Sequence, residues 1–535
     1  MGNYASCFTS PIISNQREII DFPECFSKMG INPLSNKMTI DDERFKLLTR
    51  QGRFHDLIKM LDEEILKAES YKKKLYLEYQ LAEAYYSIQD SNNAKKIVEG
   101  LLPKFHELGN QSMVGDSENL LGKIYRLHQR YSEALVHYQN AEKAFKLAKN
   151  NEGLSKIYHN LGNAYIFLER FKEAQKFHLK ALKIAQSEGK QDAIGSSHLN
   201  IGSMYFQNGE VDLAMSHFEK ARDIFKEIQD IPNLAATYHN LAESYLLRRE
   251  YISAQKNSAK AVSLYEKLQN NLGQNLALTT QARSAKAAGS LDEAINIFNQ
   301  IINPTDEILL ELGECYLNQN QTDNAKKIFE KILELPTRTS LSVGYSLDYL
   351  ARIAINEEDF IEARKIFTQL LELLLSMKPQ DPDSIASTQG NLGYMYLKMG
   401  DPKTAWEYLT FVSDYFKKRK TWDEMITLGS NYCNEFVLTK EYSRAIRVIQ
   451  EFILPAVKKS KDTMLENQYH YEVALLYHLK GETEEGLDYW NKMHNRKITF
   501  QKYSAPFLAS ILDESIKKEL ERQHLRFLKQ LLMRK

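Results

Sequence analysis

HNLGNAYIFLERFKEAQKFHLKALKIAQ, residues 159–186, combines two helical patterns with small residues at fixed offsets. Apolar side chains recur at helical spacing on both sides of the polar pair Glu169-Arg170, which predicts two amphipathic helices joined by a short turn. The first stripe consists of Leu161, Tyr165 and Leu168, and the second of Phe171, Ala174, Phe177 and Ala181.

The same offsets return along the chain at a constant interval, which is the distance from Gly122 to Gly162 and again from Gly162 to Gly202. Gly162, Tyr165, Ala174 and Ala181 have counterparts in three further sets: Gly122, Tyr125, Ala134 and Ala141; Gly202, Tyr205, Ala214 and Ala221; Ala242, Tyr245, Ala254 and Ala261. The second half keeps the pattern with looser spacing, and a weaker unit lies around residues 45–65. The sequence therefore predicts about 11–12 repeats of one helical unit.

Packing explains these residue types. Two antiparallel helices need small residues where their backbones approach, and the aromatic residue fills the wedge between one helix pair and the next. One pair cannot cover its own apolar face, so neighbouring pairs stack. We expect an all-α fold, an α-solenoid in which antiparallel helix pairs form a right-handed superhelix.

This pattern resembles the tetratricopeptide repeat (TPR) over residues 45–497. The usual TPR period is about 34 residues, and the longer units here are similar to those of the Pins/G-protein-signalling-modulator family and of kinesin light chains. The phrase NLGNAYIFLERFKEA is especially close to the Pins type, which carries Asn just before Leu-Gly. The matching asparagines are Asn160, Asn200, Asn240 and Asn391.

The chain divides into four predicted regions. Residues 1–40 form a flexible segment with a candidate lipid anchor, 41–302 a first sub-array, 303–497 a second, and 498–535 capping helices. The boundary between the sub-arrays follows from Pro304 and from the short interval between the anchors Ala282 and Gly313. A repeat with a truncated helix and unbroken stacking is the alternative.

Composition and motifs argue against several classes of function. Hydrophobic residues are 43% and charged residues 26% of the 535, which is typical of a folded protein. Lys+Arg and Asp+Glu are equal at 70 each, so no charge excess favours nucleic acid. Four scattered cysteines predict neither a zinc site nor a disulfide framework. No nucleotide, metalloprotease or hydrolase motif is present. We predict a protein that is not an enzyme and takes no cofactor, metal or small-molecule substrate.

The resemblance implies that the first helix of each unit lines a concave groove that holds a partner peptide or protein. An Asn amide offers both a donor and an acceptor to a peptide backbone, although it could instead satisfy the backbone of a neighbouring helix. The two histidines of the set are interpreted as partly exposed groove residues. The candidate partner-binding residues are His159, Asn160, Asn163, Asn200, Ser203, His239, Asn240 and Glu243.

The chain opens with MGNYASC, which fits the pattern for N-myristoylation. Gly2 is the acceptor after removal of Met1, Ser6 is in the required place, and Cys7 is a candidate for palmitoylation. Two acyl chains anchor a protein stably where one does so only marginally. The motif therefore predicts a lipid anchor at Gly2 and Cys7.

We therefore predict a scaffold or adaptor that holds protein partners, cytoplasmic and tethered to the periphery of a membrane by its N-terminal lipid. One alternative is a structural component of a cilium or axoneme that connects dynein or microtubule-associated proteins. Another is a peptide-sensing regulator or a secreted effector.

Overall fold

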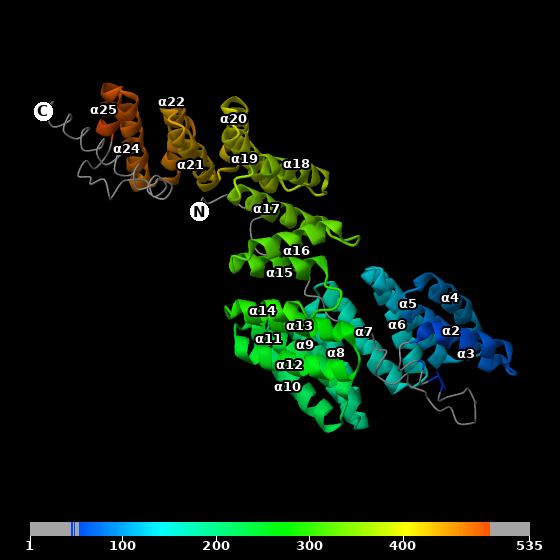
Figure 1. Cartoon of the computed structure of the whole chain (residues 1–535). Helices are drawn as coiled ribbons and strands as arrows, with labels where there is room; N and C mark the ends of the chain where they lie inside the picture. Colours follow the sequence, from blue (N-terminus) through cyan, green and yellow to red (C-terminus); the bar gives the residue numbers. More distant parts are fainter. Residues whose placement is uncertain (1–43, 46–47, 49–52, 493–535) are drawn as a thin grey trace. The chain divides into compact units, whose positions relative to one another are not determined.

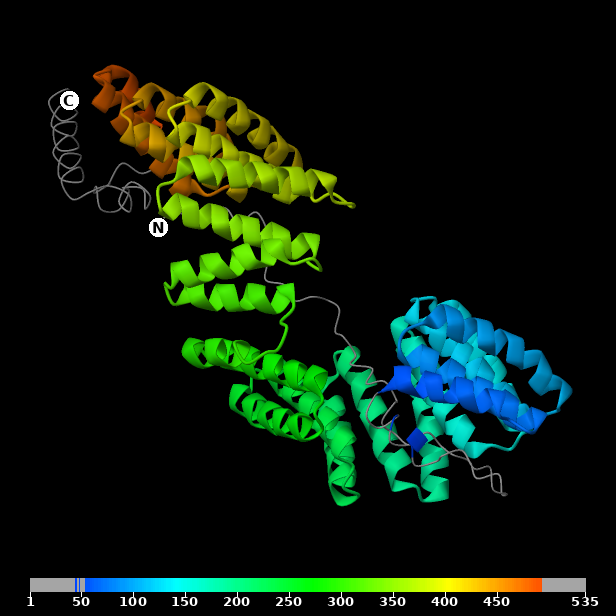
Figure 2. The same ribbon diagram turned by 45° about the vertical axis from the view of Figure 1, so that its right-hand side comes forward.

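The computed structural model describes residues 44, 45, 48 and 53–492 (Figure 1). Every regular element of this part is a helix, and no strand occurs in it. Consecutive helices pack on one another as hairpins, and each hairpin packs on the next within its unit (Figure 2). The predicted all-α solenoid of about eleven helix pairs is confirmed.

The chain divides into two compact units between Asn303 and Pro304. In the N-terminal unit Phe45 and Leu48 pack with α2, and six helix pairs follow from α3 to α14. The helices of this unit are α2 (Phe54–Leu66), α3 (Tyr71–Ser87), α4 (Ser91–Glu107), α5 (Gln111–Leu127), α6 (Tyr131–Leu147), α7 (Asn151–Phe167), α8 (Phe171–Glu188), α9 (Gln191–Gln207), α10 (Val211–Glu227), α11 (Ile231–Leu247), α12 (Tyr251–Lys267), α13 (Asn271–Ala287) and α14 (Leu291–Phe298).

Helix ends explain why the period is so regular. From α3 to α14 the helices begin at a constant interval, and α3, α4, α5, α6 and α7 all have 17 residues. The turn after such a helix contains a residue with positive φ, such as Gly209 (φ 83°) or Glu169 (φ 57°), which ends the helix in a left-handed conformation. Several of the next helices begin with an N-cap side chain; Asn150 Oδ1, for example, accepts the amide of Gly153 at 2.9 Å.

In several repeats the small residue of the first helix makes room for a ring on the second helix. A Cβ on Gly202 would lie 2.6 Å from the ring of Phe218, and one on Gly162 would lie 2.5 Å from the ring of His178. At Gly162 the three atoms nearest to an added Cβ all belong to the His178 ring, whereas at Gly202 the backbone oxygen of Ala214 also lies 3.2 Å away, so the close backbone approach that we expected is present only at Gly202. The space is needed by a buried side chain of the paired helix.

The C-terminal unit begins with a shorter repeat. Its helices α15 (Asp306–Asn318) and α16 (Thr322–Glu334) have 13 residues each, whereas the two helices that follow them have 17 each. The remaining helices of the unit are α17 (Ser340–Asn356), α18 (Phe360–Ser376), α19 (Pro382–Lys398), α20 (Pro402–Arg419), α21 (Trp422–Leu438), α22 (Tyr442–Val448), the π-helix η2 (Ile449–Ile453), α23 (Leu454–Ser460), α24 (Thr463–Lys480) and α25 (Thr483–Asn491).

One π-helical turn interrupts the second helix of the repeat that starts at α21. Pro455 follows η2 closely, and a proline ring inside an α-helix clashes with the carbonyl four residues earlier, here that of Glu451. The π-helical segment Ile449–Ile453, which is wider than an α-helix, includes the residue that carries this carbonyl. The helix therefore continues through Pro455 as α22, η2 and α23.

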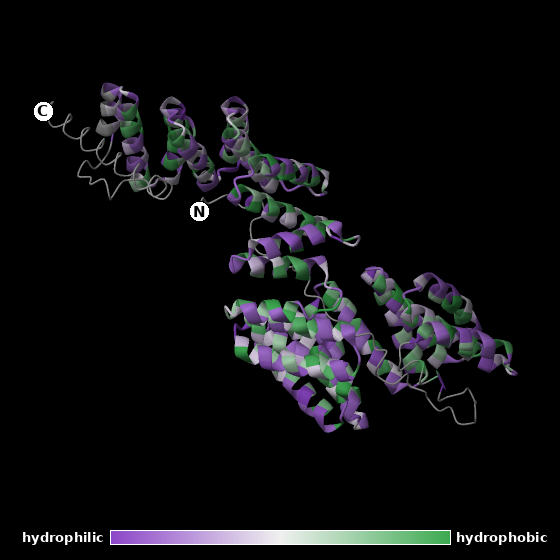
Figure 3. Cartoon of the chain, in the orientation of Figure 1, coloured by the Kyte–Doolittle hydropathy of each residue, from purple (hydrophilic) through white to green (hydrophobic). Residues whose placement is uncertain are grey.

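Polar and apolar residues alternate around most helices, as Figure 3 shows by colour. The fully buried large side chains are mostly rings of second helices, among them Tyr138, Phe218, Tyr265 and Phe329. Each helix pair therefore buries its apolar stripes against its partner and its neighbours, which leaves the polar residues of the first helices as the candidates for recognition.

Candidate functional site

The first helices of the N-terminal unit lie on its inner side. Successive first helices contact one another directly, from α5 to α7, α9, α11 and α13, whereas successive second helices share no comparable contact. In a stacked array the helices that approach most closely line the concave face. The tenth and thirteenth residues of α7, α9 and α11 therefore form two neighbouring columns on this face, which we call the amide columns: Asn160, Asn200 and Asn240; Asn163, Ser203 and Glu243.

Three members of the amide columns are committed to bonds within the protein. Asn160 is buried, and its Nδ2 donates to Asn119 Oδ1 of α5 at 2.7 Å. The hydroxyl of Ser203 donates to the carbonyl of Leu199 at 3.0 Å. The carboxylate of Glu243 accepts from the hydroxyl of Thr280 on α13. Asn160 and Glu243 thereby join neighbouring first helices, whereas the bond of Ser203 stays within α9.

The other three members keep their side-chain amides available. Asn163, Asn200 and Asn240 are half-buried, and their amides make no hydrogen bond within the described part of the chain. Each amide has two N–H donors and one carbonyl acceptor. On the face of α7, α9 and α11 three side-chain amides are therefore without an intramolecular bond in the described part of the chain.

The two predicted histidines lie elsewhere. We expected His159 and His239 to be partly exposed, but both are buried, at 9% and 5% exposure. His159 Nδ1 lies 3.3 Å from His178 Nδ1 of α8, and His159 Nε2 lies 3.2 Å from the hydroxyl of Ser197 on α9. Burial lowers the pKa of His239. The ninth residue of a first helix thus packs against the interior, one position away from the amide columns.

Sequence reasoning missed the partners of these columns. Asn119 and Thr280 complete the bonds of Asn160 and Glu243, but the residue one repeat period before Asn160 is Leu120, so the repeat register does not point to Asn119. In the C-terminal unit Asn391 and Asn431 occupy the tenth positions of α19 and α21. The interval between these two residues equals the repeat period, which was a signal for Asn431 in the sequence.

Other kinds of site are not evident in this part of the chain. Within the described residues no three His, Cys, Asp or Glu side chains are placed to hold a metal ion. None of the described helices combines the length and apolarity that crossing a bilayer requires. Gly2 and Cys7, the predicted acylation sites, and the predicted capping segment 498–535 lie outside the described residues.

Family models of the tetratricopeptide repeat match residues 153–227 and 307–336. The chain contains tetratricopeptide repeats. The matches cover two repeats of the N-terminal unit and the shorter repeat that starts at α15, and the structure extends the helix pairs well beyond them. The finer resemblance to Pins proteins and kinesin light chains stays a prediction.

Two known sequences are similar to this TPR chain. A TPR-repeat-containing protein of Methanocaldococcus jannaschii is 21% identical over 420 residues, which span 66% of this chain and 69% of that protein. The transcriptional activator NprA of Geobacillus stearothermophilus is 28% identical over 176 residues, which span 32% of this chain and 43% of NprA. Among solved structures, a signal-transduction ATPase of Pyrococcus horikoshii with a TPR sensor is 16% identical with a TM-score of 0.41, covering 71% of this chain and 50% of that one.

Proposed function

We propose that this TPR chain is a non-catalytic scaffold that holds an extended segment of a partner protein against α7, α9 and α11. The observation that carries the proposal is the set of half-buried, unbonded amides of Asn163, Asn200 and Asn240 in the described part of the concave face. Every residue of an extended peptide needs partners for one N–H and one C=O group, and an amide side chain supplies both. Such a groove tolerates many partner sequences.

The type of fold supports a binding role. Stacked helical repeats form extended concave surfaces, and TPR repeats generally mediate protein–protein interactions. The amides also sit on helices that pack on their neighbours, so the backbone that carries them is held in place before a ligand arrives. Preorganised contacts lose little conformational entropy on binding.

A displayed library of random peptides tests the groove without knowledge of the natural partner. Peptides selected on the full chain should bind the Asn200→Ala, Asn240→Ala double variant at least about tenfold more weakly, since two backbone-directed hydrogen bonds are lost. The matched control is Lys176→Ala, Lys256→Ala, on exposed positions of the second helices α8 and α12. Selected peptides that bind both double variants equally well would show that the groove assignment is wrong.

A membrane tether is the finer proposal for the location of the scaffold. It rests on the opening MGNYASC, in which Gly2 and Cys7 are the candidate acylation sites. Labelling with an azido-myristate should mark the wild-type chain and not the Gly2→Ala variant. A wild-type chain that takes up no label would contradict the proposed membrane tether. Co-fractionation of that chain with axonemes would favour the ciliary alternative instead.

A regulatory role is the second candidate. It is supported by the similarity to NprA, which is a transcriptional activator. In that case a peptide bound by the amide columns acts as a signal, and its capture changes the activity of a second protein. A reporter that responds to the selected peptides with the wild-type chain, and not with the Asn200→Ala, Asn240→Ala variant, distinguishes this role from passive scaffolding.

A further inference from the structure

One repeat departs from its neighbours at a buried position. The first residue of each second helix from α6 to α14 is large and apolar: Tyr131, Phe171, Val211, Tyr251 and Leu291. The ring of Tyr131 stacks on Phe167 of the next repeat with centroids 4.8 Å apart, which shows how such a side chain fills the space between repeats. In α4 this residue is Ser91, which is too small to do so.

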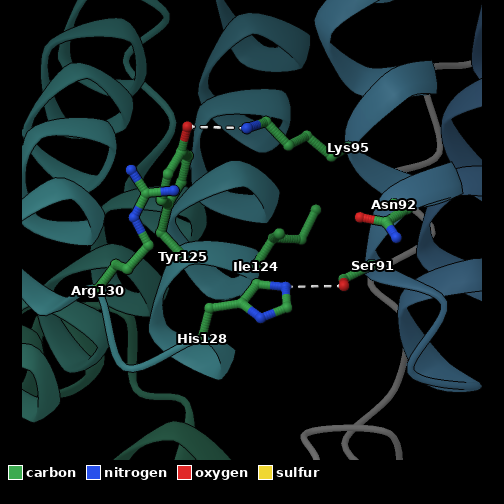
Figure 4. Close-up of a pocket in the computed structure, with 7 residues that line it drawn as sticks. All are labelled: Ser91, Asn92, Lys95, Ile124, Tyr125, His128 and Arg130. Atoms are coloured by element: carbon green, nitrogen blue, oxygen red, sulfur yellow. Dashed lines mark hydrogen bonds between the residues drawn. The ribbon is translucent and has the colours of Figure 1, made fainter.

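A cavity of about 340 Å³ lies where the large side chain is lacking (Figure 4). Besides Ser91 and Ile124, its lining consists of hydrogen-bonding side chains from α4, from the end of α5 and from the turn after it: Asn92, Lys95, Tyr125, His128 and Arg130. No acidic side chain is among these lining residues.

One cation of this cavity, Lys95, is also a departure from the repeat. Lys95 is the fifth residue of its helix, where later repeats have the uncharged Leu135, Gln175, Met215, Gln255 and Ile295. Lys95 Nζ donates to the hydroxyl of Tyr125 at 3.1 Å. Lys95 Nζ and the guanidinium carbon of Arg130 each lie 4.8 Å from the centroid of the Tyr125 ring, so two positive groups share one ring.

The other polar groups of the cavity extend this donor set. His128 Nε2 and the hydroxyl of Ser91 lie 2.8 Å apart, and Figure 4 shows this pair below Lys95 and Tyr125. In the next three repeats the position of His128 is taken by Leu168, Asn208 and Arg248. Ser91 and His128 thus bond to one another at a point where the next repeat places Tyr131 and Leu168.

Three carboxylates lie around the cavity. Asp90 caps α4 and accepts from the backbone and side chain of Asn93, so the first amides of α4 are not part of the site. Glu99 Oε1 lies 3.7 Å from Lys95 Nζ, and the carboxylate of Glu133 accepts hydrogen bonds from Nε and Nη2 of Arg130. Both ion pairs are exposed, and such pairs hold their partners weakly. A more highly charged anion can therefore displace the two carboxylates from Lys95 and Arg130.

We infer that this cavity is a binding site for a phosphoryl group. A phosphate monoester carries nearly two negative charges and three acceptor oxygens, and it is the group that a lysine, an arginine and neighbouring hydroxyl and imidazole donors recognise best. Its charge offsets the repulsion between Lys95 and Arg130. The group comes either from free phosphate or from a phosphorylated side chain of a partner.

Calorimetric titration of the full chain with inorganic phosphate, in a phosphate-free buffer of low ionic strength, tests the site. We expect saturable binding that weakens at least about tenfold in Lys95→Gln, because one charge-assisted bond is lost. This variant is conservative, since Gln175 at the same position of α8 bonds the hydroxyl of Tyr205 at 2.8 Å. Ser91→Tyr, which fills the cavity as Tyr131 fills the next, should abolish binding.

Arg130→Gln and Arg170→Gln form the matched pair. Arg170 bonds Glu173 and lies 4.8 Å from the Tyr165 ring as Arg130 does with Glu133 and Tyr125, but Tyr131 and Leu168 stand where the cavity would be. The Arg130→Gln variant should no longer bind phosphate, whereas the Arg170→Gln variant should still bind it. Equal losses in the two variants, or no saturable binding by the wild type, would overturn the site.

O-phosphoserine and a short phosphoserine peptide distinguish the sources of the phosphoryl group. Affinities equal to that of inorganic phosphate indicate free phosphate as the ligand. A peptide that binds at least about tenfold more tightly, with the same sensitivity to Lys95→Gln, indicates a phosphorylated partner. Circular dichroism of each variant checks that the helical array is retained.

Discussion

His178 and His159 share a hydrogen bond in the packed interior between α7 and α8, with their Nδ1 atoms 3.3 Å apart. The hydroxyl of Ser197 donates to the carbonyl of Ala193 at 2.8 Å, so its oxygen accepts from Nε2 of His159. His159 Nδ1 is then the acceptor, and His178 Nδ1 the donor. Nε2 of His178 has no partner in the described part of the chain.

This bond makes the N-terminal unit sensitive to acid. His178 is fully buried, and burial together with the neighbouring His159 holds its pKa well below the usual value. The unfolded chain takes up a proton at His178 near pH 6.5 while the folded chain does not, so stability falls as the pH drops below about 6.5, by roughly 1 kcal/mol per pH unit. His198 and His217 on α9 and α10, also with lowered pKa values, add to the same trend.

The double variant His159→Leu, His178→Phe should remove much of this sensitivity. It copies the pair that the next repeat carries at the same positions, Leu199 and Phe218. We expect its thermal midpoint to exceed that of the wild type by more at pH 5.5 than at pH 7.5. A constant difference between the two pH values would show that these histidines do not cause the acid sensitivity.

Gly202→Ala should destabilise the N-terminal unit by about 1–3 kcal/mol, because the new Cβ overlaps the buried ring of Phe218. Gly100→Ala is the matched control. Gly100 lies exposed within α4 with no atom within 4 Å of an added Cβ, so alanine should stabilise this helix by up to about 1 kcal/mol. Urea unfolding of the two variants measures the difference, and a stabilised Gly202→Ala variant would contradict the packing described.

Arg249→Gly should raise the free energy of unfolding by about 1 kcal/mol. Arg249 has φ 61°, in the left-handed region that costs a residue with a Cβ but not glycine. Gly209 ends the preceding first helix at the same position with φ 83°. Gly209→Arg should therefore lower stability by a similar amount in the same unfolding assay, and equal stabilities of the two variants would refute this account of the turns.

Much of the array could be predicted from the sequence because its causes are local and periodic. Ala174 belongs to a column that recurs in every helix pair of the N-terminal unit from α3 to α14, as Ala94, Ala134, Ala214, Ala254 and Ala294, and the same interval separates the helix pairs in the structure. The reason for the small residues was not accessible in this way, since the ring over Gly162 comes from His178 across a turn. The amide columns at Asn200 and Asn240 follow from the register, but their role stays a prediction.

Departures from the pattern were harder to interpret than the pattern itself. The Gly, Tyr and Ala columns do not include the first residues of second helices, where Ser91 replaces a large apolar side chain. The bond of His159 to His178 joins two different helices across a turn, which no helical period predicts. The π turn before Pro455 likewise depends on how a whole helix packs.

Glu472→Gln should stabilise α24, because Glu472 is a carboxyl group buried without a bond. It is 1% exposed, and neither of its oxygens has a hydrogen-bond partner in the described part of the chain. Burial raises the pKa of Glu472 well above its usual value. The folded chain then keeps a proton that the unfolded chain releases above about pH 4.3, so this residue costs stability that increases as the pH rises from there through the folded pKa.

Glutamine is neutral at every pH and has nearly the same shape. We expect the opening free energy of α24 at pH 7 to rise by about 1–3 kcal/mol in Glu472→Gln, measured by hydrogen exchange of its amides, with a smaller gain at pH 5. Glu407→Gln, at an exposed position of α20, is the control and should change exchange little. A loss of protection in α24 would mean that Glu472 is ionised and bonded in the folded chain, and a gain that is the same at both pH values would mean that the raised pKa of Glu472 is not its cause.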